Sequence, residues 1–169
     1  MKKNIIFFDR DGVINKDTRY THKIKDFIFI DGIFELMQNI QDRFEFIIIT
    51  NQSGINRKYY TIDDFKILSE WMIKQFSQKN IQILDIFFCP HKPCDNCECR
   101  KPKIGMIKQA CAKYPINLQK SWFIGDNISD MQCATNANIN NKILISQNKP
   151  RDIKCIVIKE IKEALNIIK

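Results

Sequence analysis

Two pairs of aspartates in this sequence have the type and spacing of metal-binding carboxylates. Asp9 and Asp11 stand two residues apart where the apolar run 4–8 gives way to a polar segment, and Asp126 and Asp130 lie one helical turn apart after another apolar run. Hard carboxylate oxygens with no soft donor nearby suit Mg²⁺. An Asp-x-Asp-Gly segment also forms plain turns, and Asp126 could be a simple helix cap, so neither pair alone decides the chemistry.

A polar loop directly follows the apolar run 45–49 and carries groups that could hold a phosphate. Its residues are Thr50, Asn51, Gln52, Ser53 and Gly54. The first four supply two hydroxyls and two amides, and the glycine would allow the backbone to fold tightly around an anion. Because polar loops with glycine are common, a turn without chemical function remains an alternative.

Residues 89–99 contain a dense group of soft metal donors, namely Cys89, His91, Cys94, Cys97 and Cys99. A tetrahedral zinc takes four ligands. The set that we favour is Cys89, His91, Cys97 and Cys99, which leaves Cys94 as the spare. The alternative of four free thiols in one exposed loop would be prone to oxidation. A zinc with four protein ligands is structural, and this one would hold Arg100 and Lys101 over a neighbouring site.

The elements that must position these groups can be predicted from the apolar pattern. Six short runs rich in Ile, Val and Phe are typical of strands buried on both faces, at 4–8, 45–49, 83–88, 121–124, 142–145 and 154–158. Helical patterns lie between them, at 31–43, 61–79, 103–113 and roughly 127–137. This alternation predicts an α/β fold in which a parallel sheet lies between helices.

The positions of the expected strands predict that the candidate residues form one site. In parallel α/β sheets, ligands bind outside the carboxyl ends of the strands. The polar groups that directly follow expected strands are Asp9, Asp11, Thr50, Asn51, the cysteine and histidine cluster, and Asp126. We therefore expect four separate segments to converge on one crevice.

Length and composition predict one soluble catalytic unit. The 169 residues, 44% of them hydrophobic, suffice for a single domain over 1–169, which we expect to be a monomer. No apolar run reaches the roughly 20 residues that span a bilayer, and the start leads into a strand rather than a signal peptide. We therefore expect a cytoplasmic protein without a membrane partner, whose thiols stay free or bind metal in a reducing compartment.

The formal net charge of +8 leaves a function of another class to consider, a zinc-dependent nucleic-acid-binding module. Its lysines are scattered, however, and its aromatic residues lie mostly on apolar stripes rather than among basic residues. Three aspartates in one crevice would also repel a phosphate backbone unless a metal were bound. We therefore expect no nucleic-acid partner.

The order of these groups resembles the haloacid dehalogenase phosphatases, whose four motifs match at Asp9 with Asp11, at Thr50, at Lys101 and at Asp126 with Asp130. The resemblance runs from residue 4 to about 145 and implies a Rossmann-like haloacid dehalogenase fold and a phosphoric monoester hydrolase. The chain has no insertion between motifs that could form a lid, so the resemblance implies a member without a cap domain.

This reading assigns a role to each catalytic group. A carboxylate nucleophile can attack an anionic phosphate ester only if a metal and a lysine offset their repulsion. Mg²⁺ would be held by Asp9, Asp126 and the backbone carbonyl of Asp11, and Lys101 would neutralise the transferring oxygens, while Thr50 occupies the position of the motif hydroxyl. Asp9 would form an aspartyl phosphate, and Asp11 would act as acid and then as base.

The cysteine loop, which ends in CECRKP, resembles a subgroup that contains heptose bisphosphate phosphatases and histidinol-phosphate phosphatases. The heptose enzymes are favoured by the segments 20–24, 29–32, 50–55 and 70–72, and by Ser53, where the histidinol enzymes typically have an acidic residue. Two departures are the short step of eight residues from the first to the third cysteine of the loop and Asn127, which stands where a lysine is frequent.

The subgroup resemblance implies a small-molecule substrate, a sugar bisphosphate, and a place in the synthesis of nucleotide-activated heptose for lipopolysaccharide or another surface glycan. The residues expected to bind it are Asn51, Gln52, Ser53, Arg57 and Arg100. The two arginines suit a second phosphate at the far end of the substrate. Histidinol phosphate, which presents a cation at that end, remains the alternative.

Overall fold

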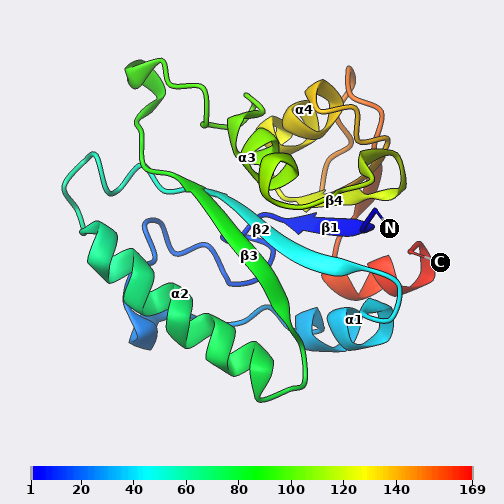
Figure 1. The fold of residues 1–169 in the computed structure, drawn as a ribbon, viewed down its shortest axis with the longest axis horizontal. Coiled ribbons are helices and arrows are strands. Elements are labelled where there is room, and N and C mark those ends of the chain that lie inside the picture. Colours follow the sequence, from blue (N-terminus) through cyan, green and yellow to red (C-terminus); the bar gives the residue numbers. More distant parts are fainter. Residues whose placement is uncertain (1, 169) are drawn as a thin grey trace.

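Residues 2–168 are described by a computed structural model, and its centre is a six-stranded parallel sheet (Figure 1). The strands are β1 (Ile5–Phe8), β2 (Glu45–Asn51), β3 (Ile83–Cys89), β4 (Trp122–Gly125), β5 (Asn141–Ile145) and β6 (Ile156–Ile158). Their order across the sheet is β3-β2-β1-β4-β5-β6, and every neighbouring pair is parallel. The chain order reverses between β1 and β4, so the sheet has a topological switch point there.

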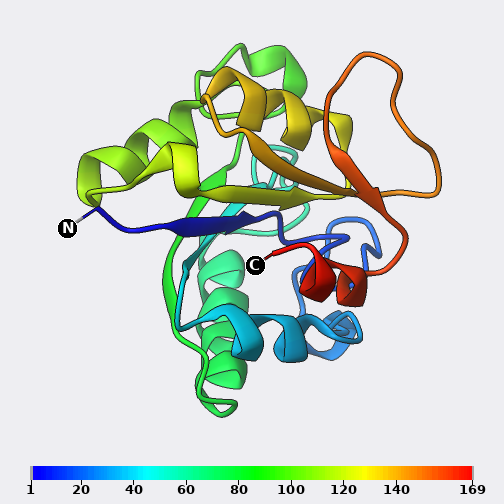
Figure 2. The ribbon, with the colours of Figure 1, turned by 90° about the vertical axis from the view of Figure 1, so that its right-hand side faces the viewer.

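Helices cover both faces of the sheet (Figures 1 and 2). Their bounds are α1 (Ile33–Ile40), α2 (Ile62–Ser77), α3 (Gly105–Lys113) and α4 (Ile128–Asn136), and short 3-10 helices cover Ile24–Asp26, Pro93–Asp95, Leu118–Lys120 and Ile161–Asn166. Ile6 and Phe8 of β1 pack in the core layer of α1 and α2, whereas Ile5 and Phe7 pack in that of α3 and α4. This is the two-sided burial expected of a central parallel strand.

The predicted α/β fold is confirmed, with all six expected strands and four expected helices present. The prediction that every strand is buried on both faces is wrong for the two edge strands. Most residues of β3 are only half-buried, and Ile156 of β6 is 43% exposed. A continuous apolar run does not distinguish an edge strand from a central one. The C-terminal turn 161–166, which packs in the same core layer as α1, was not predicted.

Strand β2 continues two residues beyond its predicted end, through Thr50 and Asn51. Thr50 pairs in register with Phe88 and Asn51 with Cys89. The start of the expected phosphate loop and the first cysteine of the soft-donor cluster therefore lie side by side in the sheet. Among residues 2–168, no helix has both the length and the apolar character needed to cross a membrane.

Candidate active site

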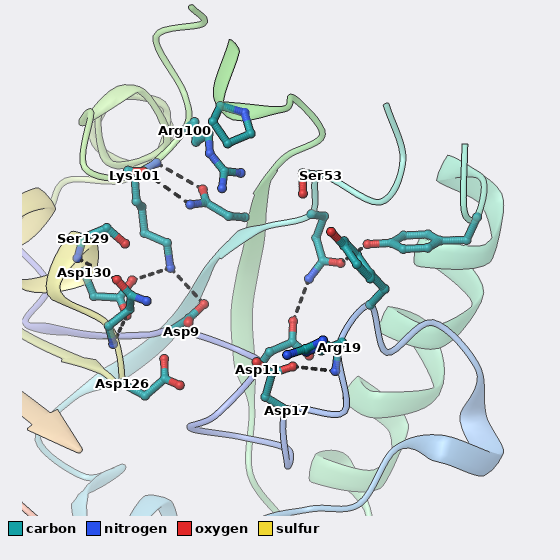
Figure 3. A pocket seen from close by; sticks show the side chains of 16 residues that line it. Asp9, Asp11, Asp17, Arg19, Ser53, Arg100, Lys101, Asp126, Ser129 and Asp130 are labelled. Atoms are coloured by element: carbon teal, nitrogen blue, oxygen red, sulfur yellow. Dashed lines mark hydrogen bonds and ion pairs between the residues drawn. The ribbon is translucent and has the colours of Figure 1, made fainter. Parts of the chain in front are cut away.

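A cavity of about 720 Å³ lies at the carboxyl ends of the strands, within the size range of small-molecule sites (Figure 3). Its walls come from the segments after β1, β2 and β4 and from the connection between β3 and α3. The expected site residues that line it are Asp9, Asp11, Asn51, Gln52, Ser53, Arg100, Lys101 and Asp126. Residues from four separate segments thus surround one crevice.

Lys101 is a buried cation between two aspartates, with only 4% of the residue exposed. Its Nζ lies 2.8 Å from Asp9 Oδ1 and 2.7 Å from Asp130 Oδ1, and it donates a hydrogen bond to the carbonyl of Ile49. Burial alone would lower the pKa of this ammonium, but the attraction of Asp130 and Asp9 outweighs burial and raises the pKa. Lys101 therefore stays charged beside the Asp9 carboxylate.

Asp9, Asp126 and Asp130 form a compact carboxylate group, in which one oxygen of each residue lies within 4.8 Å of the other two. Burial raises the pKa of Asp9 well above its ordinary value despite the attraction of Lys101, and burial together with repulsion from Asp130 raises the pKa of Asp126 to about 6. Gly12 allows this crowding, because a Cβ at its position would lie 1.9 Å from Asp126 Oδ2. Hard oxygens short of positive charge fit a divalent cation such as Mg²⁺.

Asp11 is held entirely by hydrogen-bond donors. Nη2 of Arg10 lies 2.9 Å from each carboxylate oxygen, Asn15 Nδ2 donates to Oδ1 at 3.0 Å, and Gln52 Nε2 donates to Oδ2 at 3.0 Å. Arg10 is itself almost completely buried, at 1% exposure. The Asp11 side chain is therefore fixed in orientation at the edge of the cavity rather than directed into the carboxylate group.

The soft-donor cluster contains the four residues that the sequence favoured, Cys89, His91, Cys97 and Cys99, whose ligand atoms also lie within 4.8 Å of one another. His91 Nδ1 is 3.2 Å from Cys99 Sγ and 3.5 Å from Cys89 Sγ. Burial, aided by the hydrogen bond between Cys89 and Cys99, raises the pKa of the Cys89 thiol. Cys94 is exposed and lies outside the group. Three thiols and one imidazole in this arrangement could hold a metal with a preference for soft ligands.

The soft-donor loop is joined directly to the cavity. Arg100 Nη1 donates to the backbone carbonyl of His91 at 3.2 Å. The Asn51 side chain accepts a hydrogen bond from the Lys101 N–H at 3.1 Å and donates to the Lys101 carbonyl at 3.4 Å. The cysteine loop therefore holds Arg100 in position, and the end of β2 holds the backbone of Lys101.

Two expected site residues lie outside the cavity wall. Thr50 is completely buried, and its hydroxyl accepts a hydrogen bond from Gln52 Nε2 at 2.9 Å. Arg57 is exposed, and it is absent from the described residues that line the cavity. The role assigned to Thr50 remains a prediction.

The cavity also has a wall that the sequence did not reveal, formed by Asp17, Arg19, Tyr20 and Tyr60. Arg19 and Tyr20 have positive φ values of 59° and 56°, and Asp17 Oδ1 accepts a hydrogen bond from the Arg19 N–H at 2.8 Å. The sequence pointed to segment 20–24 only through its resemblance to the heptose enzymes. A basic and an aromatic residue shortly after the Asp-x-Asp pair were the available signal.

Asn127, and Asp130 of the second aspartate pair, form the cap of α4. Asn127 accepts a hydrogen bond from the Ser129 N–H, and Asp130 Oδ2 accepts one from the Asn127 N–H. The alternative that Asp126 is merely the helix cap is therefore excluded. Because Asp130 also pairs with Lys101, the cap fixes the position of that ammonium.

Residues 4–159 match the family model described as polynucleotide kinase 3 phosphatase. A D-glycero-alpha-D-manno-heptose-1,7-bisphosphate 7-phosphatase of Campylobacter jejuni is 46% identical over 170 residues, covering 100% of this chain and 98% of the relative. A D-glycero-beta-D-manno-heptose-1,7-bisphosphate 7-phosphatase of Helicobacter pylori is 41% identical, covering 97% and 96%.

The fold also has close neighbours among solved structures. One is the D,D-heptose 1,7-bisphosphate phosphatase from B. bronchiseptica, complexed with magnesium and phosphate, with a TM-score of 0.86 at 24% identity. It covers 98% of this chain and 97% of its own. At this identity the likeness concerns the fold, and it places the sheet and its helices among haloacid dehalogenase-type structures.

Proposed function

Since the chain belongs to the polynucleotide kinase 3 phosphatase family and has the fold of haloacid dehalogenase-type structures, we propose that it hydrolyses the C7 phosphate of D-glycero-D-manno-heptose 1,7-bisphosphate. It is a phosphoric monoester hydrolase, like its relatives. The observation that carries the proposal is the full-length identity of 46% and 41% to two phosphatases named for this substrate. The pairing of Asp9 with the buried ammonium of Lys101 supports the same chemistry.

In the proposed reaction, Asp9 is the nucleophile. One of its carboxylate oxygens attacks the phosphorus as the bond to the C7 oxygen breaks, and Asp11 donates its proton to that oxygen. Water then attacks the aspartyl phosphate while Asp11 accepts a proton, which regenerates Asp9. Lys101 offsets the charge of the transferring oxygens throughout. Asp9, Asp126 and the backbone carbonyl of Asp11 would hold Mg²⁺, which supplies positive charge against the repulsion between substrate and carboxylates.

We assign the binding of the far phosphate, at C1, to two arginines on the cavity wall. Arg100 and Arg19 both line the cavity, whereas Arg57 does not. A guanidinium group binds a phosphate with two parallel hydrogen bonds and is always charged. We therefore assign Arg19, in place of Arg57, as the second arginine of the substrate site. Two guanidinium groups would repel the cationic end of histidinol phosphate, which disfavours that alternative.

Arg100→Ala is expected to lower kcat/KM for the heptose bisphosphate by about ten- to a hundredfold, since it removes one charge-assisted contact worth about 1.5 to 3 kcal/mol. The loss on heptose 7-phosphate, which lacks the C1 group, should be much smaller. Initial rates on both esters measure the difference, and Arg57→Ala is the matched control with an expected change below about threefold. Equal losses on both esters would show that Arg100 does not bind C1.

We propose that the soft-donor cluster holds a structural zinc ion through Cys89, His91, Cys97 and Cys99. The donor types and their closeness fit a closed tetrahedral site. With all four places taken by protein, the ion would have no part in the reaction. Its effect would be to keep the loop in the shape that brings Arg100 and Lys101 to the cavity.

Cys97→Ser and Cys99→Ser are expected to lose the zinc ion and to unfold at a lower temperature, because binding of a structural zinc contributes directly to folding free energy. Elemental analysis of the purified chain should give about one zinc per wild-type molecule. Cys94→Ser is the matched control, since Cys94 is exposed and outside the cluster, and it should keep the metal and the melting temperature. Full zinc content in the first two variants would refute the ligand set.

We propose that residues 1–169 form one catalytic domain that acts in the cytoplasm. There it would supply a heptose 1-phosphate for nucleotide activation and surface glycan synthesis. The names of the relatives include both the alpha and the beta anomer of the bisphosphate, so both anomers are candidate substrates of this chain.

A further inference from the structure

The phenol of Tyr60 is a buried group beside the cavity to which the reaction above gives no role. The residue is 6% exposed, and its ring stacks on that of His22 with a centroid distance of 4.9 Å and an interplanar angle of 7°. The edge of the Tyr60 ring packs closely against Gly54, because a Cβ at position 54 would lie only 2.1 Å from Tyr60 Cε1. Burial raises the pKa of Tyr60 to about 12, so its hydroxyl remains a donor at neutral pH.

The Tyr60 hydroxyl donates to the side-chain oxygen of Gln52, which is itself only 2% exposed. The amide nitrogen of Gln52 then points the other way, toward Asp11 Oδ2 at 3.0 Å and Thr50 Oγ1 at 2.9 Å. A flipped amide would aim its oxygen at the Asp11 carboxylate, where two acceptors would oppose each other. The Tyr60 hydroxyl therefore favours the amide orientation that lets Gln52 hold Asp11.

The contact from Gln52 differs from the other contacts that Asp11 makes. Arg10 and Asn15 belong to the same short segment as Asp11 and move with it. Gln52 lies 41 residues further along the chain, just after the end of β2. Its hydrogen bond thus fixes the Asp11 carboxyl relative to the sheet and to the cavity wall that Asn51 and Ser53 share.

We propose that Tyr60 is a positioning residue, which acts through Gln52 to aim the Asp11 carboxyl group at the leaving oxygen of the substrate. This inference rests on the proposed role of Asp11 as the acid that protonates the departing alkoxide. No bond to Tyr60 forms or breaks in the reaction. Its hydroxyl keeps its proton and only selects the orientation of the Gln52 amide.

The dependence on the leaving group separates this role from a merely structural one. An alkyl phosphate needs the proton from Asp11, whereas p-nitrophenyl phosphate releases a stable phenolate without it. The value of kcat/KM reports only the steps up to release of the alcohol, so later hydrolysis of the aspartyl phosphate does not enter. Tyr60→Phe should lower kcat/KM on the heptose bisphosphate about three- to tenfold, and on p-nitrophenyl phosphate less than twofold.

The controls make the test decisive. Tyr59→Phe removes a hydroxyl from a neighbouring residue that is 56% exposed, and it should change neither rate. In an Asp11→Asn background, Tyr60→Phe should have no further effect on kcat/KM, because the group that it positions is gone. Equal losses on the two esters, or no loss on either, would overturn the role of Tyr60.

Asp11→Asn alone distinguishes a failure of this inference from a failure of the proposed reaction. If that variant loses far more on the heptose bisphosphate than on p-nitrophenyl phosphate, the acid role of Asp11 stands and the outcome for Tyr60→Phe decides the inference. If Asp11→Asn affects both esters equally, the acid role is wrong, and the positioning role of Tyr60 is overturned with it.

Discussion

Asp9→Asn is expected to lower turnover by about a thousandfold or more, because the amide cannot attack phosphorus and is a poorer ligand for Mg²⁺. The fold should persist. Burial raises the pKa of Asp9 in the folded chain. Ionisation of Asp9 therefore destabilises the metal-free fold progressively as the pH rises above the ordinary pKa of an aspartate. At neutral pH the neutral amide removes that cost, and the melting temperature of the metal-free variant should be unchanged or higher.

Phosphate release and thermal unfolding, measured on the same preparations, check both parts of this expectation. Asp63→Asn is the matched control, because Asp63 has a side chain that is 87% exposed and lies far along the chain in the first turn of α2. That variant should keep full activity. Retention of even a tenth of wild-type turnover by Asp9→Asn would refute the assignment of the nucleophile.

The positions of the strands could be predicted from the sequence because each strand is a short, isolated apolar run between helical patterns. The rule that ligands bind at the carboxyl ends of parallel strands then placed Asp9, Asn51 and Asp126 at one cavity, which they line. Edge position could not be predicted in this way. Apart from Asp85, the residues of β3 are as apolar as those of β1, and the strand order shows that β3 has a single neighbour.

The second arginine of the substrate site could not be identified from sequence spacing. Arg57 follows the polar loop after β2 closely enough to suggest a place in the site, yet it is exposed and does not line the cavity. Arg19 reaches the cavity because its loop has positive φ angles at Arg19 and Tyr20 and because Asp17 holds its backbone. Neither the loop conformation nor the direction of its side chains follows from residue types alone.

The partners of Lys101 illustrate the same limit. Its place in a motif and the soft-donor loop before it could both be inferred from the sequence. The ion pair with Asp130 depends instead on the way Asn127 and Asp130 cap α4, which brings that carboxylate to 2.7 Å from Lys101 Nζ. The motifs placed Lys101 and Asp130 at one site, but their direct contact is seen only in the folded chain.

The substrate is the central claim, and a panel of phosphate esters tests it most directly. The panel contains both anomers of D-glycero-D-manno-heptose 1,7-bisphosphate, histidinol phosphate and a 3′-phosphorylated oligonucleotide, each assayed with Mg²⁺ for initial rates. Phosphorus NMR identifies which phosphate leaves. Two charge-assisted contacts to C1, from Arg100 and Arg19, predict that kcat/KM for one anomer exceeds that for histidinol phosphate by about a hundredfold or more, with release from C7. Preference for histidinol phosphate or the oligonucleotide, or release from C1, would contradict the account.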